Sequence, residues 1–159
     1  MPIEFSWLVD YVARVHERTY EILEPLTEEL VEWRPRQSEW TFADAVIHIA
    51  NTRLMNIGTI LGRSGKYAGH EPPAKATVQV LRRHLEHSSQ LTMEGLRVAD
   101  LAAAVRTIRG QLVPAYQVAV SGLIEHEVHH RSQLCEYLTS AGLTPPALYG
   151  LHEEDLPRS

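Results

Sequence analysis

The sequence contains a single cysteine, Cys135, among its 159 residues. One thiol cannot form a disulfide within the chain, and it cannot supply the several sulfur ligands of a cysteine-rich zinc module. Long apolar runs are also missing, since no stretch approaches the roughly 20 residues that a membrane-spanning helix needs. Any metal site in this chain is therefore expected to depend on histidine, and a membrane-spanning protein is not expected.

Charge of one sign is not concentrated anywhere along the chain. Lysine and arginine number 15 and aspartate and glutamate 20, which gives a formal net charge of −5 with histidine neutral. No basic tract or stripe appears, although domains that bind nucleic acid usually carry one. The first residues lack the basic and apolar segments of a secretory signal peptide. We therefore expect a cytoplasmic protein that binds neither nucleic acid nor membrane.

The length and composition are those of a globular domain. Hydrophobic residues make up 44% of the chain and charged residues 22%, which is ordinary for a soluble protein. A chain of this length buries roughly 70% of its unfolded surface when it folds as one unit. We expect residues 1–159 to form one domain.

Four segments carry apolar residues at the three- and four-residue spacing of an amphipathic helix. They span about Phe5–Leu23, Thr41–Gly62, Ala74–Gly95 and Ala115–Ala141. The third segment is expected to turn Leu91 inward. The stretch Arg97–Pro114 is ambiguous, because its first half has helical spacing and its second half resembles a turn or an extended crossover. No alternating strand pattern of useful length appears, and we predict an all-α four-helix bundle.

Short motifs mark the ends of these segments. Thr41 and Asp44 have the spacing of a capping box at the start of the second helix. Gly142 follows the last helix at the position that favours a left-handed C-terminal cap. Thr27 is expected to cap a short helical turn after the first helix. Asp44 also precedes His48 by one helical turn, so it either caps its helix or orients that imidazole.

Three of the nine histidines have the arrangement of metal ligands. His126 and His130 are four residues apart, which places their Cβ atoms about 5–6 Å apart on one helix face. His48, on the second predicted helix, lies at the margin of the apolar stripe and completes a set of three nitrogens. Three protein ligands with an open position are typical of catalytic zinc sites. The spacing alone also fits hydrogen-bonded histidines at the edge of the core.

Other residues with reactive or aromatic side chains have less specific surroundings. We expect His129 to lie at the surface or beside the ligands, and His84 and His87 to lie on a solvated helix face. Cys135 is expected to be a small buried side chain rather than a reactive thiol. Trp40 is expected to be either a wedge at the helix entrance or the wall of a pocket. No ligand-spaced partner exists for His16, His70 and His152.

Several segments resemble, in order, the DinB-like family, which includes YfiT-type metalloenzymes. They are Leu30–Pro35, Trp40–Ile49, Leu123–Leu134 and Ala141–Pro146. The resemblance covers nearly the whole chain, and Arg97–Pro114 departs from it most. It implies a four-helix bundle, often homodimeric, that binds a divalent metal ion such as zinc or nickel through three histidines. These histidines correspond to His48, His126 and His130.

The resemblance also implies a class of reaction. Characterised relatives include enzymes that use a low-molecular-weight thiol such as bacillithiol or mycothiol, so we expect a metal-dependent thiol S-transferase acting on a small-molecule substrate. Two alternatives stay open. One is metal-dependent hydrolysis with Glu125 or Glu127 as the base, and the other is a non-catalytic, metal-stabilised stress-response binding module. Imidazole ligands do not distinguish zinc, nickel and iron.

Overall fold

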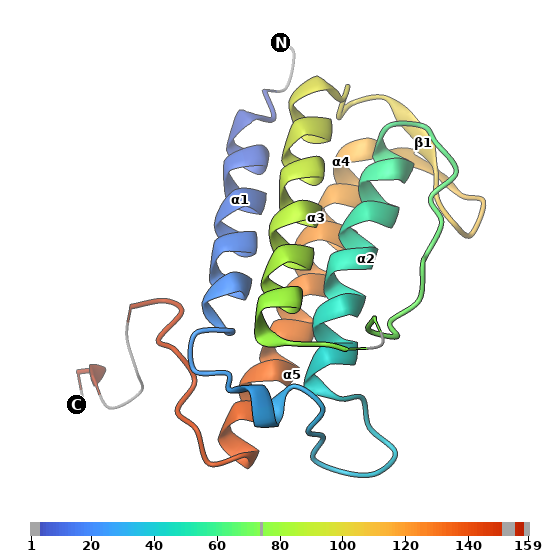
Figure 1. The fold of residues 1–159 in the computed structure, drawn as a ribbon. Helices are drawn as coiled ribbons and strands as arrows, with labels where there is room; N and C mark the ends of the chain where they lie inside the picture. The colour runs from blue at the N-terminus through green and yellow to red at the C-terminus, as the bar shows by residue number, and fades with distance from the viewer. Residues whose placement is uncertain (1–3, 74, 151–154, 158–159) are drawn as a thin grey trace.

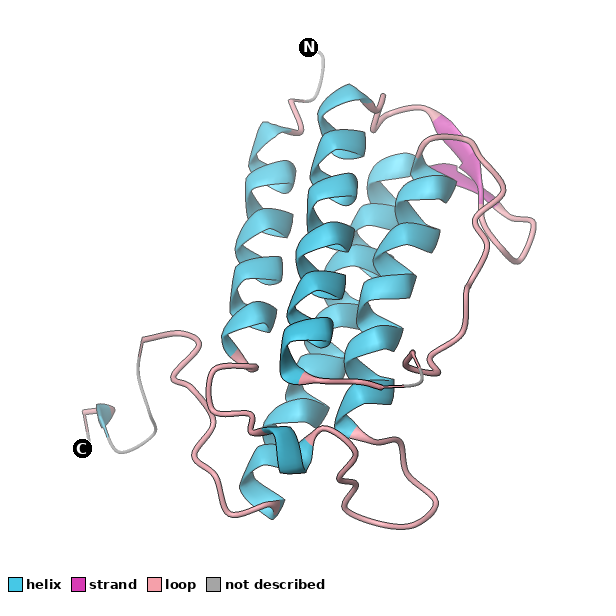
Figure 2. Ribbon diagram, viewed as in Figure 1, coloured by secondary structure: helices cyan, strands magenta, loops and turns pink. Residues whose placement is uncertain are grey.

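The computed structural model describes residues 4–73, 75–150 and 155–157. Four helical rods lie side by side as a bundle, with a small hairpin at one end (Figures 1 and 2). The elements in chain order are α1 (Ser6–Glu21), the 3-10 turn η1 (Glu28–Leu30), α2 (Phe42–Ile60), α3 (Val78–Val98), β1 (Ala104–Arg106), β2 (Leu112–Pro114), α4 (Ala115–Val118), the π-helical segment η2 (Ala119–Glu125) and α5 (His126–Ser140). The last three form one continuous rod, and the predicted all-α four-helix bundle is confirmed.

The connection between α2 and α3 is long and determines how the helices are arranged. The connection, described over residues 61–73 and 75–77, leaves one end of α2 and returns along its side to the other end, so that α3 runs parallel to α2 (Figure 1). The parallel direction agrees with the contacts, since Arg53 meets Leu85 while Ile57, one turn later, meets Gly95. This returning loop passes beside the candidate site described below.

The predicted end signals of α2 and α5 are present as hydrogen bonds. The hydroxyl of Thr41 accepts from the Asp44 amide at 3.0 Å, and the Asp44 carboxylate accepts from the Thr41 amide at 2.8 Å. This reciprocal pair is a capping box, a device typically worth about 1 kcal/mol. At the other end, Gly142 has a φ of +83° and the Leu143 amide donates to the Leu138 carbonyl at 2.9 Å. Thr27 precedes η1 but makes no capping hydrogen bond.

Two expectations about the middle of the chain were wrong in detail. Helix α3 begins at Val78, because the Thr77 hydroxyl accepts from the Val80 amide at 3.1 Å and starts the helix there. Leu91 is 39% exposed, since the buried face of α3 continues from Ser88 to Thr92 and Leu96 instead. A single helical wheel does not distinguish these neighbouring positions.

The ambiguous stretch before the last rod forms a two-stranded antiparallel hairpin. Its three residue pairs include Val105 opposite Val113. Val105 and Leu101 are both buried against the end of the bundle, whereas Ile108 at the tip is 68% exposed. The apparent helical spacing in this stretch therefore arose because two core residues, Leu101 in a turn and Val105 in a strand, are four positions apart.

A π-helical turn interrupts the rod that was predicted as one regular helix. Within η2, Gly122 lies against Asn56 of α2, and a Cβ atom at residue 122 would overlap the Asn56 side chain. Asn56 Nδ2 donates to the Gly122 carbonyl at 3.2 Å, so the two rods meet closely here. The wider turn changes the rotation of every later residue, including those of α5. The sequence shows a glycine at position 122, but it does not indicate the π-helical turn or the contact with Asn56.

Replacement of Gly122 by alanine is expected to lower the free energy of unfolding by about 1–3 kcal/mol, because the added methyl group overpacks the contact with Asn56. In an open helix position the same change stabilises by up to about 1 kcal/mol. Gly58→Ala in α2 is the matched control, since its nearest non-helical neighbour would be 3.7 Å from the new Cβ. Urea unfolding curves compare the two variants. Equal stabilities would show that the close approach at Gly122 is not a constraint.

The apolar core consists of two clusters, one toward each end of the bundle. The first includes Ile22, Ile49, Leu85 and Leu134, and the second includes Leu8, Ile57, Leu96 and Leu123. On each of the four rods, a buried polar or charged residue lies between the members of the two clusters: His16, Arg53, Ser88 and Glu127. We call these four residues the buried ionic layer.

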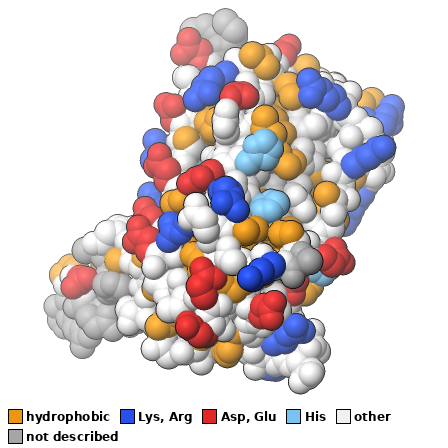
Figure 3. Space-filling view, viewed as in Figure 1, with side chains coloured by type: hydrophobic (Ala, Val, Ile, Leu, Met, Phe, Trp, Pro, Cys, Tyr) orange, Lys and Arg blue, Asp and Glu red, His pale blue; other side chains and the backbone are white. Residues whose placement is uncertain are grey.

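On the face seen in Figure 3, acidic side chains lie mainly at the left and lower parts, and several basic side chains lie together at the upper right. Within the described part of the chain, no helix combines the length and the apolar character needed to cross a membrane.

Candidate metal centre

The structure brings together all three histidines that were predicted as ligands. His48 projects from α2, and His126 and His130 project from α5, one helical turn apart. One ring nitrogen of each lies within 4.8 Å of the others. His48 Nε2 and His126 Nε2 are 3.1 Å apart, which requires one of the two nitrogens to carry a proton when no ion is bound. Two helices thus supply a compact group of imidazole nitrogens.

Two of these imidazoles are oriented through their second nitrogen. The Tyr67 hydroxyl is 2.6 Å from His48 Nδ1, and Gln133 Oε1 accepts from His130 Nδ1 at 3.0 Å. Oxygen partners of this kind fix the ring orientation of metal-binding histidines. His126 differs, because its Nδ1 is buried without a hydrogen-bond partner among the described residues.

Asp44 does not orient His48, and of its two predicted roles only capping is confirmed. Its carboxylate is engaged with the backbone amide of Thr41. The partner of His48 is instead Tyr67, which lies in the loop that returns along α2. Tyr67 was not predicted, since nothing in a loop without periodicity indicates which helix residue it will meet.

The three imidazoles are held in the neutral form near pH 7. Burial, followed by repulsion from the neighbouring histidines, lowers the pKa of His48 and of His126 to about 4. Burial also lowers the pKa of His130, although the hydrogen bond to Gln133 opposes the shift. Neutral imidazole is the form that binds a metal ion.

The residues fit a divalent ion in chemistry and approximately in spacing. Tetrahedral Zn–N bonds of about 2.0–2.1 Å place two nitrogens roughly 3.3 Å apart, close to the 3.1 Å between His48 and His126. The distances to His130, which reach at most 4.8 Å, require a small inward movement. The oriented outer nitrogens of His48 and His130 favour binding, while His126 lacks this support.

Trp40 forms a wall of the site, which decides between its two predicted roles. Its ring lies 4.7 Å from His48 and 5.9 Å from His130, measured between centroids. His70, from the returning loop, stacks on the same indole at 4.5 Å. A hollow of about 290 Å³ opens beside Trp40 and His130 and is lined by Ser38, Glu39, Trp40, His129, His130 and Gln133. A small molecule placed there would lie next to the histidine group.

The other candidate residues lie away from the histidine group or outside the described residues. Glu127 is buried against Arg53, and Glu125 is exposed, so neither has the position expected of a catalytic base. Cys135 is half-buried in a different hollow with Ser132 and Glu136, and burial raises the pKa of its thiol. His129 and His87 are exposed and His84 is half-buried, while His152 lies outside the described residues.

Comparison with known proteins agrees with this fold. The model of the DinB family matches residues 1–158. The chain belongs to the DinB family. Two solved structures share the fold of this DinB chain. A DinB-like protein from Bacillus cereus is 22% identical and aligns over 88% of this chain and 94% of its own, with a TM-score of 0.74. One from Bacillus subtilis is 18% identical over 90% and 98%, with a TM-score of 0.73. No curated protein matches the chain.

In this DinB chain the Tyr67 hydroxyl is expected to matter for metal affinity more than for stability. Tyr67→Phe removes the hydrogen bond to His48 Nδ1, and the loss of such a partner typically weakens metal binding about 10–100-fold. The side chain is 41% exposed, so unfolding free energy should change by less than about 0.5 kcal/mol. Competition with a chromophoric chelator measures the affinity. Tyr11→Phe on α1 is the control, and equal affinities of the two variants would refute the role of Tyr67.

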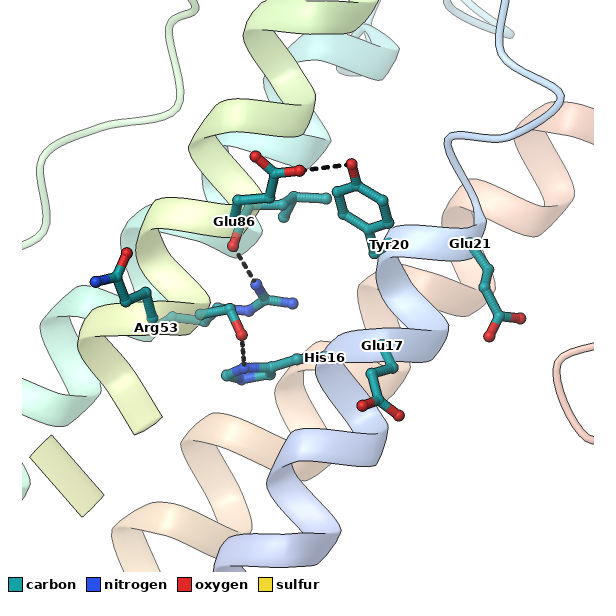
Figure 4. Close-up of a pocket in the computed structure, with 9 residues that line it drawn as sticks. His16, Glu17, Tyr20, Glu21, Arg53 and Glu86 are labelled. Atoms are coloured by element: carbon teal, nitrogen blue, oxygen red, sulfur yellow. Dashed lines mark hydrogen bonds between the residues drawn. The ribbon is translucent and has the colours of Figure 1, made fainter. Parts of the chain in front are cut away.

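Behind the histidine group, the buried ionic layer joins all four rods. Arg53 donates to Glu127 from Nε at 2.7 Å and from Nη2 at 2.5 Å, and both residues are 2% exposed. His16 Nε2 lies 3.6 Å from the same carboxylate, and His16 Nδ1 is 2.9 Å from Ser89 Oγ. Figure 4 shows His16 and Arg53 at the side of a hollow between α1 and α3, with Glu17 and Glu21 directed away. This layer was not predicted, because its charged members have the sequence pattern of surface residues.

His16 makes the metal-free protein sensitive to acid. Burial, and then the charge of Arg53, lowers the pKa of His16 to about 3 from the usual 6.5, although Glu127 opposes the shift. Below pH 6.5 the unfolded chain therefore takes up a proton that the folded chain does not, and stability falls as the pH falls. The expected loss from this residue is up to about 2 kcal/mol between pH 6.5 and 5.

Urea unfolding in the presence of EDTA at these two pH values measures the loss. His16→Gln removes the titrating group, and its amide offers a hydrogen-bond partner for Ser89. Histidines in the metal centre titrate in both proteins, so the difference between wild type and variant isolates His16. An unchanged pH dependence in the variant would contradict the assignment.

Proposed function

We propose that this chain is a metal-dependent thiol S-transferase whose divalent ion is held by His48, His126 and His130. The observation that carries the proposal is the group of three imidazole nitrogens within 4.8 Å of one another, at the edge of a hollow walled by Trp40. Family membership supports a catalytic role for the group, because the DinB-like resemblance implies three-histidine metal sites and enzymes that use small thiols.

The chain's own residues provide ligands, orientation and a binding surface rather than a nucleophile. An ion bound there would lower the pKa of a thiol that coordinates it, so that a thiolate forms near neutral pH. Tyr67 and Gln133 hold two of the rings in place. The Trp40 indole offers an apolar surface, while Ser38 and Glu39 add polar groups at the hollow.

An external thiol fits better than a chain cysteine. Cys135 lines a separate hollow, and the raised pKa of its half-buried thiol keeps it protonated at neutral pH. The attacking sulfur is therefore proposed to come from a low-molecular-weight cosubstrate. It would form a new S–C bond to an electrophilic carbon, while the electron pair of the broken bond leaves with the leaving group.

Hydrolysis is the second candidate, and its support is weaker. It needs a base to accept a proton from the attacking water. Glu127 is engaged by Arg53, and Glu125 points to solvent. Glu39 lines the hollow but lies 3.5 Å from the Arg36 guanidinium, which holds it in an ion pair. A free thiol already has a pKa of about 8.5, far below the value of about 15.7 for water, so a bound ion would form a thiolate more readily than a hydroxide.

The proposal is tested in two steps on the full chain. Purified protein is stripped with chelator, loaded separately with Zn²⁺, Ni²⁺ or Fe²⁺, and analysed for bound metal. Loaded protein is then incubated with bacillithiol, mycothiol or glutathione and 1-chloro-2,4-dinitrobenzene, and the S-conjugate is measured by mass spectrometry. We expect conjugation above the uncatalysed rate with one thiol, only with metal present.

Two variants sharpen this assay. Cys135→Ser should keep full activity, because the chain thiol takes no part, whereas His48→Ala should reduce conjugation to background. Metal-loaded protein that forms no conjugate with any of the three thiols would rule out the proposed activity for this electrophile class. A hydroxylated product in place of the conjugate would favour hydrolysis, and metal binding without either product would favour the non-catalytic module.

A further inference from the structure

Helix α2 meets the continuous rod of η2 and α5 through a series of polar contacts that begins at the histidine group. His48 meets His126, Arg53 meets Glu127, and Asn56 donates to the Gly122 carbonyl. Glu127 follows His126 directly in the chain, and Arg53 follows His48 by five residues. The ion pair therefore lies beside the histidine contact and joins the same two helices.

The ion pair is more restrictive than apolar packing between two helices. Arg53 donates through both Nε and Nη2 to the two oxygens of Glu127, and this two-pronged geometry allows one relative placement. The remaining nitrogen of Arg53, Nη1, donates to the Leu85 carbonyl of α3 at 3.0 Å. His16 Nε2 of α1 lies 3.6 Å from Glu127 Oε2. The Glu127 carboxylate of α5 and its Arg53 partner thus contact residues of α1 and α3 as well as each other.

Burial of these two charges costs free energy, so stability alone does not explain why the chain keeps them in its core. Transfer of each ion from water costs several kcal/mol, and apolar residues of similar size often stabilise a protein as well as a buried pair does. The layer also separates two apolar clusters that could otherwise be continuous. A defined register between helices is the best-attested gain from such buried polar groups.

We propose that the Arg53–Glu127 pair is a positioning device for the metal centre. It fixes the register of α2 against α5, so that His48 on one helix meets His126 and His130 on the other. This inference rests on the proposed function of these histidines as ligands. Neither Arg53 nor Glu127 is proposed to touch the ion or the substrate.

The test replaces both charges by apolar side chains of similar length. Arg53→Met/Glu127→Met should fold, because neither charge of the pair is left behind without its partner, and the Ser88 hydroxyl still donates to the Leu85 carbonyl. Two measurements follow: the affinity and visible spectrum of bound Co²⁺, and proton NOEs between the imidazole rings in the metal-free protein. In the wild type, the rings of His48 and His130 have centroids 4.5 Å apart, so NOEs are expected.

We expect Co²⁺ binding to weaken about 10–100-fold in the double variant, the range found when groups supporting metal ligands are removed. The ligand-field spectrum should change in position or intensity, and the His48–His130 NOEs should weaken. Val12→Ala is the control, because Val12 is fully buried in the second apolar cluster and touches none of the ligands. It should lower stability without altering the spectrum or the NOEs.

A double variant with wild-type Co²⁺ affinity, spectrum and NOEs would overturn the inference. If the double variant does not fold, Arg53→Lys replaces it, since lysine keeps the charge but cannot make the two-pronged contact. Wild-type affinity in that variant would overturn the inference in the same way. If the wild type itself binds no Co²⁺, the proposed metal function fails, and the NOEs alone still decide whether the pair positions the histidines.

Discussion

Replacement of His126 by alanine is expected to abolish stoichiometric metal binding while the bundle stays folded. His126 Nε2 lies 3.1 Å from His48 Nε2 in the group of three, so its loss leaves only two imidazoles, His48 and His130, which come from different helices. The metal-free fold should change little, because His126 Nδ1 makes no hydrogen bond to the described residues. The contrast between lost binding and kept structure is what separates a ligand from a core residue.

Elemental analysis and thermal unfolding measure this contrast together. An ion present at 100 times its dissociation constant stabilises the folded state by about 2.7 kcal/mol. The wild-type melting temperature should therefore rise on addition of Zn²⁺ or Ni²⁺, and that of His126→Ala should not. His87→Ala is the matched control, because this exposed histidine lies on α3 away from the site. Equimolar metal in the His126 variant would exclude the proposed ligand set.

Much of the candidate site could be predicted from the sequence, because helical periodicity relates residues within one helix. The four-residue spacing of His126 and His130 is enough to place both on one side of a helix. His48 needs a further assumption, that two apolar stripes face each other, and the bundle satisfies it. Tyr67 could not be predicted, since its contact with His48 depends on the path of a long loop.

The parts of the fold that could not be predicted involve contacts between elements. Gly122 and Asn56 meet through a π-helical turn that no spacing in the sequence indicates. Glu127 has the sequence position of a base beside the ligands, yet it is turned into the core by a partner 74 residues away. Burial of a charged helix residue is costly unless a partner for the charge lies opposite, and a single sequence does not state that pairing.

Single replacement of Arg53 by methionine is expected to lower the unfolding free energy by about 3–5 kcal/mol, the usual result of removing one partner of a buried pair. The change leaves the Glu127 carboxylate inside the core without its guanidinium partner, and His16, 3.6 Å away, is neutral near pH 7 in the native protein because its pKa is lowered to about 3. Domains of this kind have a total unfolding free energy of about 5–15 kcal/mol, so the variant should retain only a small part of its folding stability. Glu127→Met should cost a similar amount, because it leaves the guanidinium unpaired.

Urea unfolding of both single variants and the double variant forms a thermodynamic cycle. The double variant should be more stable than either single one, since the cost arises from an unpaired charge rather than from lost volume. Additive losses of unfolding free energy would instead show that the two side chains contribute independently, with no interaction energy between Arg53 and Glu127. Arg83→Met on the exposed face of α3 is the control for loss of an arginine, and it should change stability by less than about 0.5 kcal/mol.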